Sequence, residues 1–138
     1  MNEESQNPAQ GNISRRVLVI EDNFDSAETL QTFLDIYGHK VSVAHSGKSG
    51  LATAEEFLPE VIICDIGLSG ELDGFDVARA VRRLEQLKSV FLIALSGYGQ
   101  PEDKEKSQRA GFDLHLVKPT DFDALLELLN NFDRSRRN

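Results

Sequence analysis

Five short apolar runs alternate with five longer amphipathic stretches along almost the whole chain. Short unbroken apolar runs are typical of buried parallel strands, and apolar residues at three- and four-residue steps are typical of helices. The predicted strands span residues 16–20, 40–44, 61–65, 91–95 and 114–117. The predicted helices span residues 24–37, 47–57, 75–86, 101–110 and 121–132. This alternation predicts an α/β fold in which a parallel sheet carries helices on both faces.

The length of 138 residues suits one domain with a single core. Residues 1–14 are polar, with almost nothing to bury, and are predicted to form a flexible N-terminal arm. The alternating pattern places the domain at residues 15–132. Residues 133–138 are predicted to form a short basic tail.

The chain is acidic, with a formal net charge of −8. This charge argues against binding to nucleic acid, because phosphate backbones are bound by clustered Lys and Arg side chains. The single cysteine, Cys64, lies inside an apolar run and indicates a reducing compartment. No apolar run approaches the ~20 residues that span a bilayer, and no secretion leader opens the chain. We therefore expect a cytoplasmic protein that does not associate with membranes.

Two predicted helices bear on possible interactions. Helix 101–110 is nearly all polar, so it can bury little and should be among the less stable elements, free to shift. Helix 121–132 carries an apolar stripe of about 160°, at ~100° per residue. Core packing is the simpler explanation of this stripe, but its width leaves an edge that permits a homodimer.

Polar side chains follow four of the predicted strands, at the point where each strand ends. Glu21 and Asp22 follow the first strand, Asp65 closes the third, Ser96 follows the fourth and Lys118 follows the fifth. The carboxyl ends of parallel strands meet at the edge of the sheet where ligands bind. We therefore expect these side chains to lie close together.

These residue types suit phosphoryl transfer. Clustered carboxylates repel one another unless a cation joins them, and hard oxygen ligands favour Mg²⁺ (or Mn²⁺) over zinc. Asp65 could then attack phosphorus as the nucleophile. Lys118 and the hydroxyl of Ser96 could hold the phosphoryl oxygens, where charge must be stabilised.

Each residue also has a purely structural explanation. Asp22 could cap the helix that begins near Phe24, and Ser96 with Gly97 could form only a turn. Lys118 alone could be a surface charge. An accidental occurrence of such residues at all four strand ends is much less credible than one shared site.

The residues and their motifs resemble the receiver domain of two-component response regulators. The resemblance extends from about Arg15 to Phe132 and rests on Val17–Asp22, Val61–Gly67, Asp73–Phe75, Ala94–Tyr98 and Ala110–Pro119. It implies a doubly wound, flavodoxin-like sheet of five parallel strands in the order 2-1-3-4-5. It also implies a stand-alone response regulator of a phosphorelay, because only one helix and a short tail follow Lys118.

The resemblance implies Mg²⁺-dependent phosphorylation of Asp65 by a histidine kinase or a histidine phosphotransfer protein. Asp22, Asp65 and the backbone carbonyl of Gly67 would hold the metal, with Glu21 assisting through water. Such a protein is not a conventional enzyme. It takes part in phosphotransfer to its own aspartate and would dephosphorylate itself.

The resemblance also implies an output. Ser96 would contact the phosphoryl group and move with it, and Lys118 would pair with it. His115 stands where the family usually carries a rotating Tyr or Phe, so Ser96 and His115 are the candidate switch residues. The switch would change the surface of the last two β/α units and control an output protein partner. The alternative for His115 is a solvent-facing side chain on an edge strand.

Two further regions depart from the family pattern or bear on phosphoryl lifetime. Ser69 stands where the family usually has Pro, and Glu71-Leu72 makes this loop one residue longer, which bears on metal affinity. Gly67 and Tyr98 border the path of hydrolytic water, which Gly67 leaves open and Tyr98 could shield.

Other classes fit the sequence less well. A haloacid-dehalogenase-like phosphatase needs a second Asp where Gly67 stands, and its acid pair comes late in the chain. A phosphate-binding loop around Gly47-Lys48-Ser49 needs Gly where Ser42 stands. A serine-hydrolase elbow needs Gly in place of Ala94 and Tyr98. An interaction module that keeps the fold without using phosphate is the remaining rival, and the full set of site residues argues against it.

Overall fold

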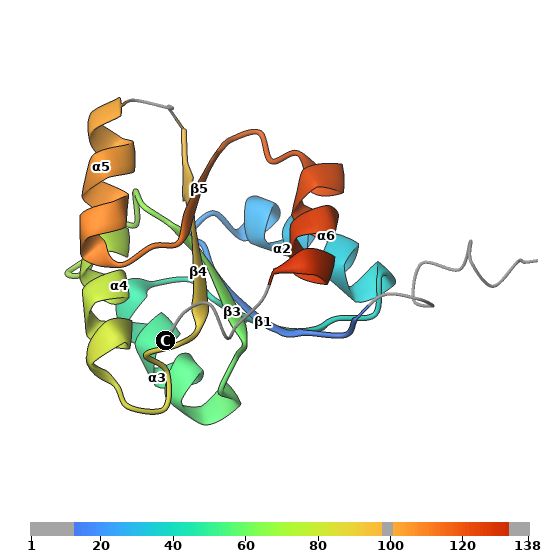
Figure 1. Ribbon diagram of the computed structural model, residues 1–138, viewed down its shortest axis with the longest axis horizontal. Helices are drawn as coiled ribbons and strands as arrows, with labels where there is room; N and C mark the ends of the chain where they lie inside the picture. The colour runs from blue at the N-terminus through green and yellow to red at the C-terminus, as the bar shows by residue number, and fades with distance from the viewer. Residues whose placement is uncertain (1–12, 98–100, 133–138) are drawn as a thin grey trace, which may run out of the picture.

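The computed structural model describes residues 13–97 and 101–132, which form five strands and five helices in alternation. The strands are β1 (Arg16–Ile20), β2 (Lys40–Ala44), β3 (Val61–Asp65), β4 (Phe91–Ser96) and β5 (Leu114–Val117). All neighbours pair in parallel, in the order β2-β1-β3-β4-β5. The predicted doubly wound sheet and its strand order are confirmed (Figure 1).

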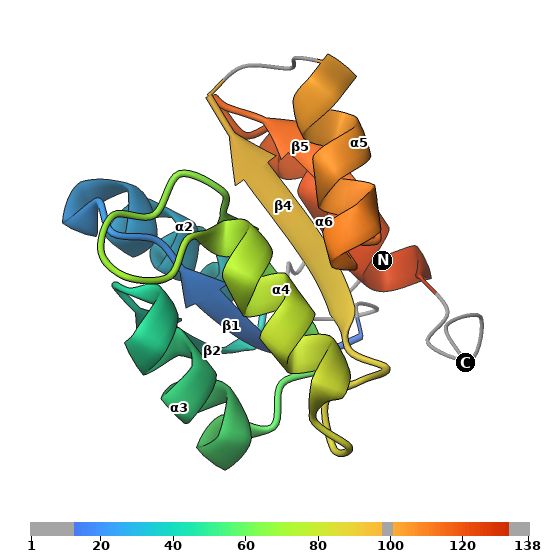
Figure 2. The ribbon, with the colours of Figure 1, turned by 90° about the vertical axis from the view of Figure 1, so that its left-hand side faces the viewer.

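Helices cover both faces of the sheet. They are α2 (Phe24–Ile36), α3 (Gly47–Phe57), α4 (Gly74–Arg83), α5 (Pro101–Ala110) and α6 (Phe122–Asn131). Helices α2 and α6 lie on one face and α3, α4 and α5 on the other (Figures 1 and 2). Among the described residues, no helix is both long and apolar enough to cross a bilayer.

Two apolar layers make up the core, one on each face of the sheet. On the face of α3, α4 and α5, buried side chains include Leu18, Ile62, Val77, Val81 and Phe112. On the face of α2 and α6, they include Val19, Ile63, Ile93, Leu34 and Leu129. Successive residues of β3 therefore point into opposite layers, and both layers are apolar. This explains why the central strands are unbroken apolar runs rather than alternating ones.

Helix α4 is shorter than predicted. The sequence predicts a helix to residue 86, but α4 ends at Arg83 and Leu84 is extended. Leu87 is nevertheless buried, because the chain folds back and Arg82 donates hydrogen bonds to the carbonyls of Lys88 and Val90. The apolar spacing therefore continues past the end of the helix, which makes the helix look longer in the sequence.

Helix α2 is capped by Asn23, not by Asp22. The Asn23 side chain accepts a hydrogen bond from the Ser26 backbone N–H, as an N-cap residue does. The structural explanation of Asp22 as a helix cap is therefore wrong, and its carboxylate is left for other contacts.

Helix α5 buries few of its described side chains, in keeping with its polar sequence. Ser107 and Ala110 are buried. The ammonium of Lys106 lies 5.2 Å from the centre of the Phe75 ring at the start of α4. The remaining described side chains, residues 104–106, 108 and 109, are exposed. The arm up to residue 12, the tail from residue 133 and Tyr98 lie outside the described residues.

Candidate functional site

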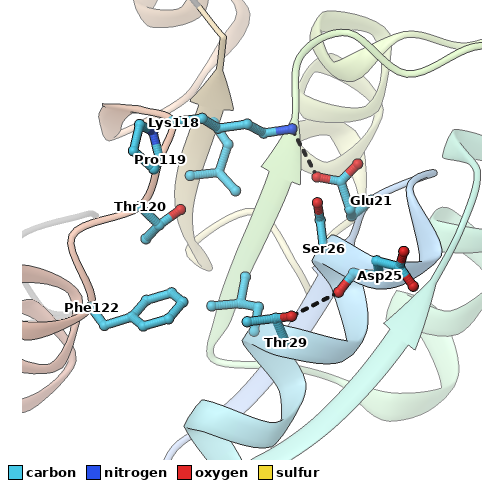
Figure 3. A pocket seen from close by; sticks show the side chains of 10 residues that line it. Glu21, Asp25, Ser26, Thr29, Lys118, Pro119, Thr120 and Phe122 are labelled. Atoms are coloured by element: carbon cyan, nitrogen blue, oxygen red, sulfur yellow. Dashed lines mark hydrogen bonds and ion pairs between the residues drawn. The ribbon is translucent and has the colours of Figure 1, made fainter.

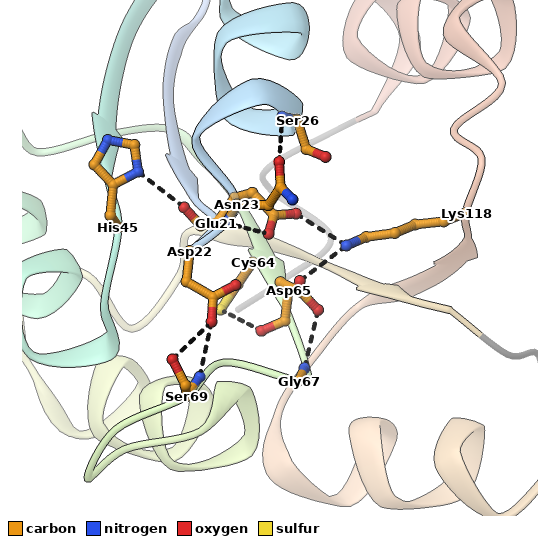
Figure 4. Close-up of polar contacts among 10 residues, drawn as sticks. All are labelled: Glu21, Asp22, Asn23, Ser26, His45, Cys64, Asp65, Gly67, Ser69 and Lys118. Carbon is orange, nitrogen blue, oxygen red and sulfur yellow. Dashed lines mark hydrogen bonds and ion pairs between the residues drawn. The ribbon is translucent and has the colours of Figure 1, made fainter.

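Three carboxylates gather at the carboxyl edge of the sheet. Glu21 and Asp22 follow β1 and Asp65 ends β3, and one ligand oxygen from each lies within 4.8 Å of the others. Glu21 and Asp65 are buried, and Asp22 is partly exposed. The ends of β1 and β3 therefore meet, as predicted (Figure 4).

Lys118 joins two of these carboxylates. Its Nζ lies 2.9 Å from Oδ2 of Asp65 and 3.0 Å from Oε1 of Glu21, and a third of its side chain is exposed. Partial burial alone would lower the pKa of Lys118, but hydrogen bonds to Asp65 and Glu21 together raise it. Lys118 is therefore a charged partner inside the site, not an isolated surface charge.

Glu21 is the most deeply buried acid of the cluster. Burial raises its pKa above the usual value, and hydrogen bonds from the Asn23 backbone N–H and from Lys118 oppose this effect. The neighbouring charge of Asp65 raises the pKa further. Glu21 thus holds a proton more readily than an exposed glutamate does.

Asp22 is held by the loop that follows β3. Its Oδ2 accepts hydrogen bonds from the backbone N–H and from the side-chain hydroxyl of Ser69, both 2.9 Å long. These bonds, the backbone one first, lower the pKa of Asp22 despite partial burial. Asp22 therefore stays ionised more readily than an exposed aspartate does.

Asp65 is fixed by its own loop. Its Oδ1 accepts a hydrogen bond of 2.9 Å from the backbone N–H of Gly67. The turn continues to Gly74, whose N–H donates to the carbonyl of Ile66. A Cβ at Gly74 would lie 2.5 Å from the carbonyl oxygen of Asp65, so only glycine allows α4 to start this close to the strand.

Ser96 connects the site to α5 through His115. Nε2 of His115 lies 2.8 Å from the Ser96 hydroxyl oxygen, and Nδ1 lies 3.2 Å from the Ser107 hydroxyl oxygen. The Ser107 hydroxyl donates to the carbonyl of Lys104, which can only accept. Ser107 therefore accepts from Nδ1–H, and in a neutral ring Nε2 accepts from the Ser96 hydroxyl. The solvent-facing alternative for His115 is wrong, because its ring is half-buried and bridges two side chains.

A cavity of about 450 Å³ opens beside Lys118, between α2 and the loop after β5. Figure 3 shows Ser26 and Thr29 from α2 facing Lys118, Thr120 and Phe122 across this space. Of the three clustered carboxylates, Glu21 lines this cavity.

Three contacts of the site were not predicted from the sequence. The Asn23 backbone N–H donates to Glu21, and Ser69 donates to Asp22. The Ser107 hydroxyl contacts Nδ1 of His115. Asn23 directly follows the acid pair, and Asn is a common N-cap residue, so the sequence did carry a signal for this residue. Nothing in the sequence indicated the other two contacts, because their partners lie on different elements of the fold.

The residues present fit a hard divalent cation. Three carboxylates converge, and Lys118 is the one cation that the described residues place against them. One positive charge does not balance three carboxylates, and no His or Cys side chain of the described chain belongs to the cluster. Oxygen ligands of this kind suit Mg²⁺.

Comparisons with known proteins agree with this geometry. Residues 17–130 match the family described as the response regulator receiver domain. The chain belongs to this family. The protein PilH of Pseudomonas aeruginosa is 30% identical over 115 residues, which are 83% of this chain and 94% of PilH.

Solved structures of receiver domains superpose well. Chemotaxis protein CheY4 of Vibrio cholerae has a TM-score of 0.79 at 28% identity, covering 91% of this chain and 100% of CheY4. The receiver domain of the sensor histidine kinase PA1611 from P. aeruginosa has a TM-score of 0.77 at 27% identity. That match covers 85% of this chain and 95% of the PA1611 domain, whose structure has a magnesium ion in the active-site cleft.

Membership of the family establishes the general role. The protein is a receiver domain of two-component signalling. Receiver domains are signalling domains rather than conventional enzymes, and they bind Mg²⁺ in an acidic pocket. The described part of this chain contains an acidic cluster, formed by Glu21, Asp22 and Asp65.

Proposed function

We propose that Asp65 accepts a phosphoryl group from a phosphohistidine of a histidine kinase or a histidine phosphotransfer protein. The observation that carries this proposal is the Lys118 ammonium bound to Asp65 inside the acidic cluster. A carboxylate oxygen of Asp65 forms the new bond to phosphorus, and the phosphorus–nitrogen bond of the donor breaks. The imidazole nitrogen leaves with the electron pair and takes a proton from solvent.

Mg²⁺ (or Mn²⁺) belongs to this proposal. Asp22, Asp65 and the backbone carbonyl of Gly67 would hold it, with Glu21 in an outer role. The metal would supply positive charge that screens the incoming phosphoryl oxygens from the carboxylates. Lys118 holds the carboxylate of Asp65 in place before transfer and is positioned to pair with a phosphoryl oxygen afterwards.

The output follows from the connection between Ser96 and α5. Phosphorylation adds about −1.5 to −2 charge beside Ser96, and its hydroxyl turns to donate to a phosphoryl oxygen. Nε2 of His115 then loses its donor, which weakens the contact that His115 makes to Ser107. The surface of α5, β5 and α6 changes and an output protein partner binds it.

The differential stabilisation that phosphorylation supplies determines how completely the switch changes state. Moving an equilibrium from 1:99 to 99:1 requires ~5.5 kcal/mol of differential stabilisation. Exchange of one or two hydrogen bonds supplies only about 1–3 kcal/mol, so partial activation is expected. A homodimer formed after phosphorylation through the exposed edge of α6 belongs to the same proposal.

The proposal also includes loss of the phosphoryl group to water and a cytoplasmic location. Gly67 is exposed and leaves room beside Asp65 for a water molecule. The buried free thiol of Cys64 suits a reducing compartment.

The deciding experiment is the mass of the intact protein after incubation with Mg²⁺ and a small acyl phosphate. Gain of one phosphoryl group is expected for the wild type and for Asp35→Asn, an exposed acid on α2 that serves as a matched control. Asp65→Asn should gain none. Phosphorylation of Asp65→Asn to the wild-type level would contradict the assignment of Asp65.

An interaction module that does not use phosphate is the rival function. If the wild type shows no adduct, the phosphate mimic beryllofluoride separates the two. Binding of beryllofluoride that depends on Mg²⁺ indicates rapid hydrolysis in a working receiver. Absence of such binding favours the interaction module.

A further inference from the structure

The loop between β3 and α4, residues 66–73, is held at both ends without any help from Asp22. At its start, Gly67 N–H donates to Oδ1 of Asp65, and the next side chain, Leu68, is buried in the core. At its end, Asp73 caps α4 in a reciprocal capping box with Asp76. Ser69 lies between these anchors, and its side chain is exposed.

Ser69 directs two donors to a single oxygen on a different strand end. Its backbone N–H and its hydroxyl both donate to Oδ2 of Asp22, which lies 47 residues earlier in the sequence (Figure 4). A carboxylate oxygen has two lone pairs, so these bonds satisfy Oδ2 in full. The rotation of the Asp22 carboxylate is thereby fixed, and Oδ1 is the oxygen that Ser69 leaves available.

The contact closes a ring around the site. Asp65 binds the N–H of Gly67, the chain continues for two residues to Ser69, and Ser69 binds Asp22. Asp22 lies beside Asp65 in the carboxylate cluster. The loop that carries Gly67 is therefore fastened to two of the three carboxylates, so the carbonyl of Gly67 and the carboxylate of Asp22 are held relative to each other.

We propose that Ser69 is the positioning residue of the metal site, and that its hydroxyl sets the affinity for Mg²⁺ by fixing Asp22 and the Gly67 loop together. This inference rests on the metal site of the proposed function, but not on phosphorylation of Asp65. Groups that orient metal ligands typically change metal affinity by roughly 10–100-fold when they are removed. Because Ser69 is exposed and its N–H bond survives loss of the hydroxyl, the lower end of this range applies.

Simple fastening of the loop is the competing explanation. The loop already has anchors at Gly67, Leu68 and Asp73, so a further fastening is not required there. A fastening role also predicts a change in stability without a change in Mg²⁺ affinity. The two explanations therefore predict different Mg²⁺ affinities for a protein without the Ser69 hydroxyl.

The test is calorimetric titration of the full chain with MgCl₂, without any phosphodonor. Ser69→Ala should bind Mg²⁺ about tenfold more weakly than the wild type. Ser69→Thr, which keeps the hydroxyl, should come within about threefold of the wild type. Ser49→Ala removes an exposed hydroxyl of α3 that contacts Ser46 in its own turn, and it should bind as the wild type does.

Amide chemical shifts of Gly67 and Asp22 during the same titration provide a second measurement. In Ser69→Ala, both should move only at higher Mg²⁺ concentration, while thermal unfolding in EDTA stays close to that of the wild type. Equal Mg²⁺ affinity in Ser69→Ala and the wild type would overturn the inference. So would absence of Mg²⁺ binding by the wild type, which would also remove the metal from the proposed function.

The two proposals can fail separately. If the wild type binds Mg²⁺ but gains no phosphoryl group, and Ser69→Ala binds more weakly, the positioning role holds and the phosphoacceptor role does not. If Asp65 is phosphorylated and Ser69→Ala keeps full Mg²⁺ affinity, the phosphoacceptor role holds and the positioning role is wrong.

Discussion

Nε2 of His115 on β5 lies 2.8 Å from the hydroxyl oxygen of Ser96 at the end of β4. Because Nδ1 of the same ring contacts Ser107 on α5, one imidazole connects the edge of the acidic site to a helix on the outside of the domain. An aromatic ring without nitrogens could fill this space but could not make either contact. The connection therefore depends on the hydrogen bonds and not only on the volume of the side chain.

We predict that His115→Ala and His115→Phe both accept the phosphoryl group at close to the wild-type rate, because His115 supplies no ligand atom to the acidic cluster. Both should lose the response of α5 to phosphorylation. The measurement is amide hydrogen exchange over residues 104–117 with and without beryllofluoride. His115→Phe is the control for ring volume, and a response equal to that of the wild type would remove the hydrogen bonds of His115 from the mechanism.

Replacement of Lys118 should affect stability as well as phosphorylation. In Lys118→Met, Glu21 and Asp65 keep their burial but lose their shared cation. Breaking a fully buried ion pair costs about 3–5 kcal/mol, and exposure of a third of the Lys118 side chain reduces this to about 1–2 kcal/mol at pH 7. Urea unfolding at pH 7 measures the difference between the two chains.

The loss in Lys118→Met should become smaller as the pH falls toward about 4, where carboxyl groups take up protons and no longer need the cation. The matched control is Lys88→Met, which removes an exposed lysine whose partner Glu85 is also exposed. Its stability should change by less than about 0.5 kcal/mol. Equal effects of the two substitutions would contradict the pairing in the site.

The parallel sheet and the meeting of the strand ends followed from the sequence, because both depend on local patterns. The strand order was implied by the resemblance to receiver domains. Runs such as Val61–Asp65 are buried on both faces, which requires a parallel sheet between helices. Once the strands are parallel, Glu21, Asp65 and Lys118 must share one edge. The convergence of the site therefore needed no knowledge of individual contacts.

The contacts of Ser69 and the end of α4 could not be predicted in the same way. The partner of Ser69 is 47 residues away, and no local pattern carries that information. The apolar spacing of Val81, Leu84 and Leu87 fits a helix equally well, but Leu87 reaches the core from a turn. In both cases the tertiary arrangement decides between local structures that the sequence leaves equivalent.

His39 should make stability depend on pH away from the acidic site. Burial lowers its pKa below the usual value near 6.5, and the charge of Arg15 lowers it further, while Glu60 opposes this. Nδ1 of the neutral ring accepts a hydrogen bond from the Arg15 backbone N–H. The contribution of His39 is thus fully present above the unfolded pKa and is lost as the pH falls below about 6.5 toward the folded pKa.

The measurement is the free energy of unfolding in urea between about pH 7.5 and 5. The wild type should lose more stability over this window than His39→Gln, in which the substituted side chain does not titrate. Both chains contain the same carboxyl groups, so the effect of these groups on stability cancels when the two pH curves are compared. Parallel pH curves would mean that His39 has the same pKa in the folded and unfolded chains.

Gly74 allows α4 to begin directly against the backbone of Asp65. In Gly74→Ala, the new Cβ would lie 2.5 Å from the Asp65 carbonyl oxygen and 2.6 Å from the Cα of Ile66. Both are backbone atoms, so the strand end that carries Asp65 must move. We expect a loss of about 1–3 kcal/mol of unfolding free energy and slower phosphorylation by an acyl phosphate.

Gly97 provides the matched substitution, because it lies directly after Ser96 and a Cβ there would meet nothing within 4 Å. Gly97→Ala should keep the stability of the wild type to within about 0.5 kcal/mol. Urea unfolding and the rate of mass gain from an acyl phosphate, measured on both variants, test the comparison. If Gly74→Ala were as stable and as readily phosphorylated as Gly97→Ala, close packing at Gly74 would not be what positions Asp65.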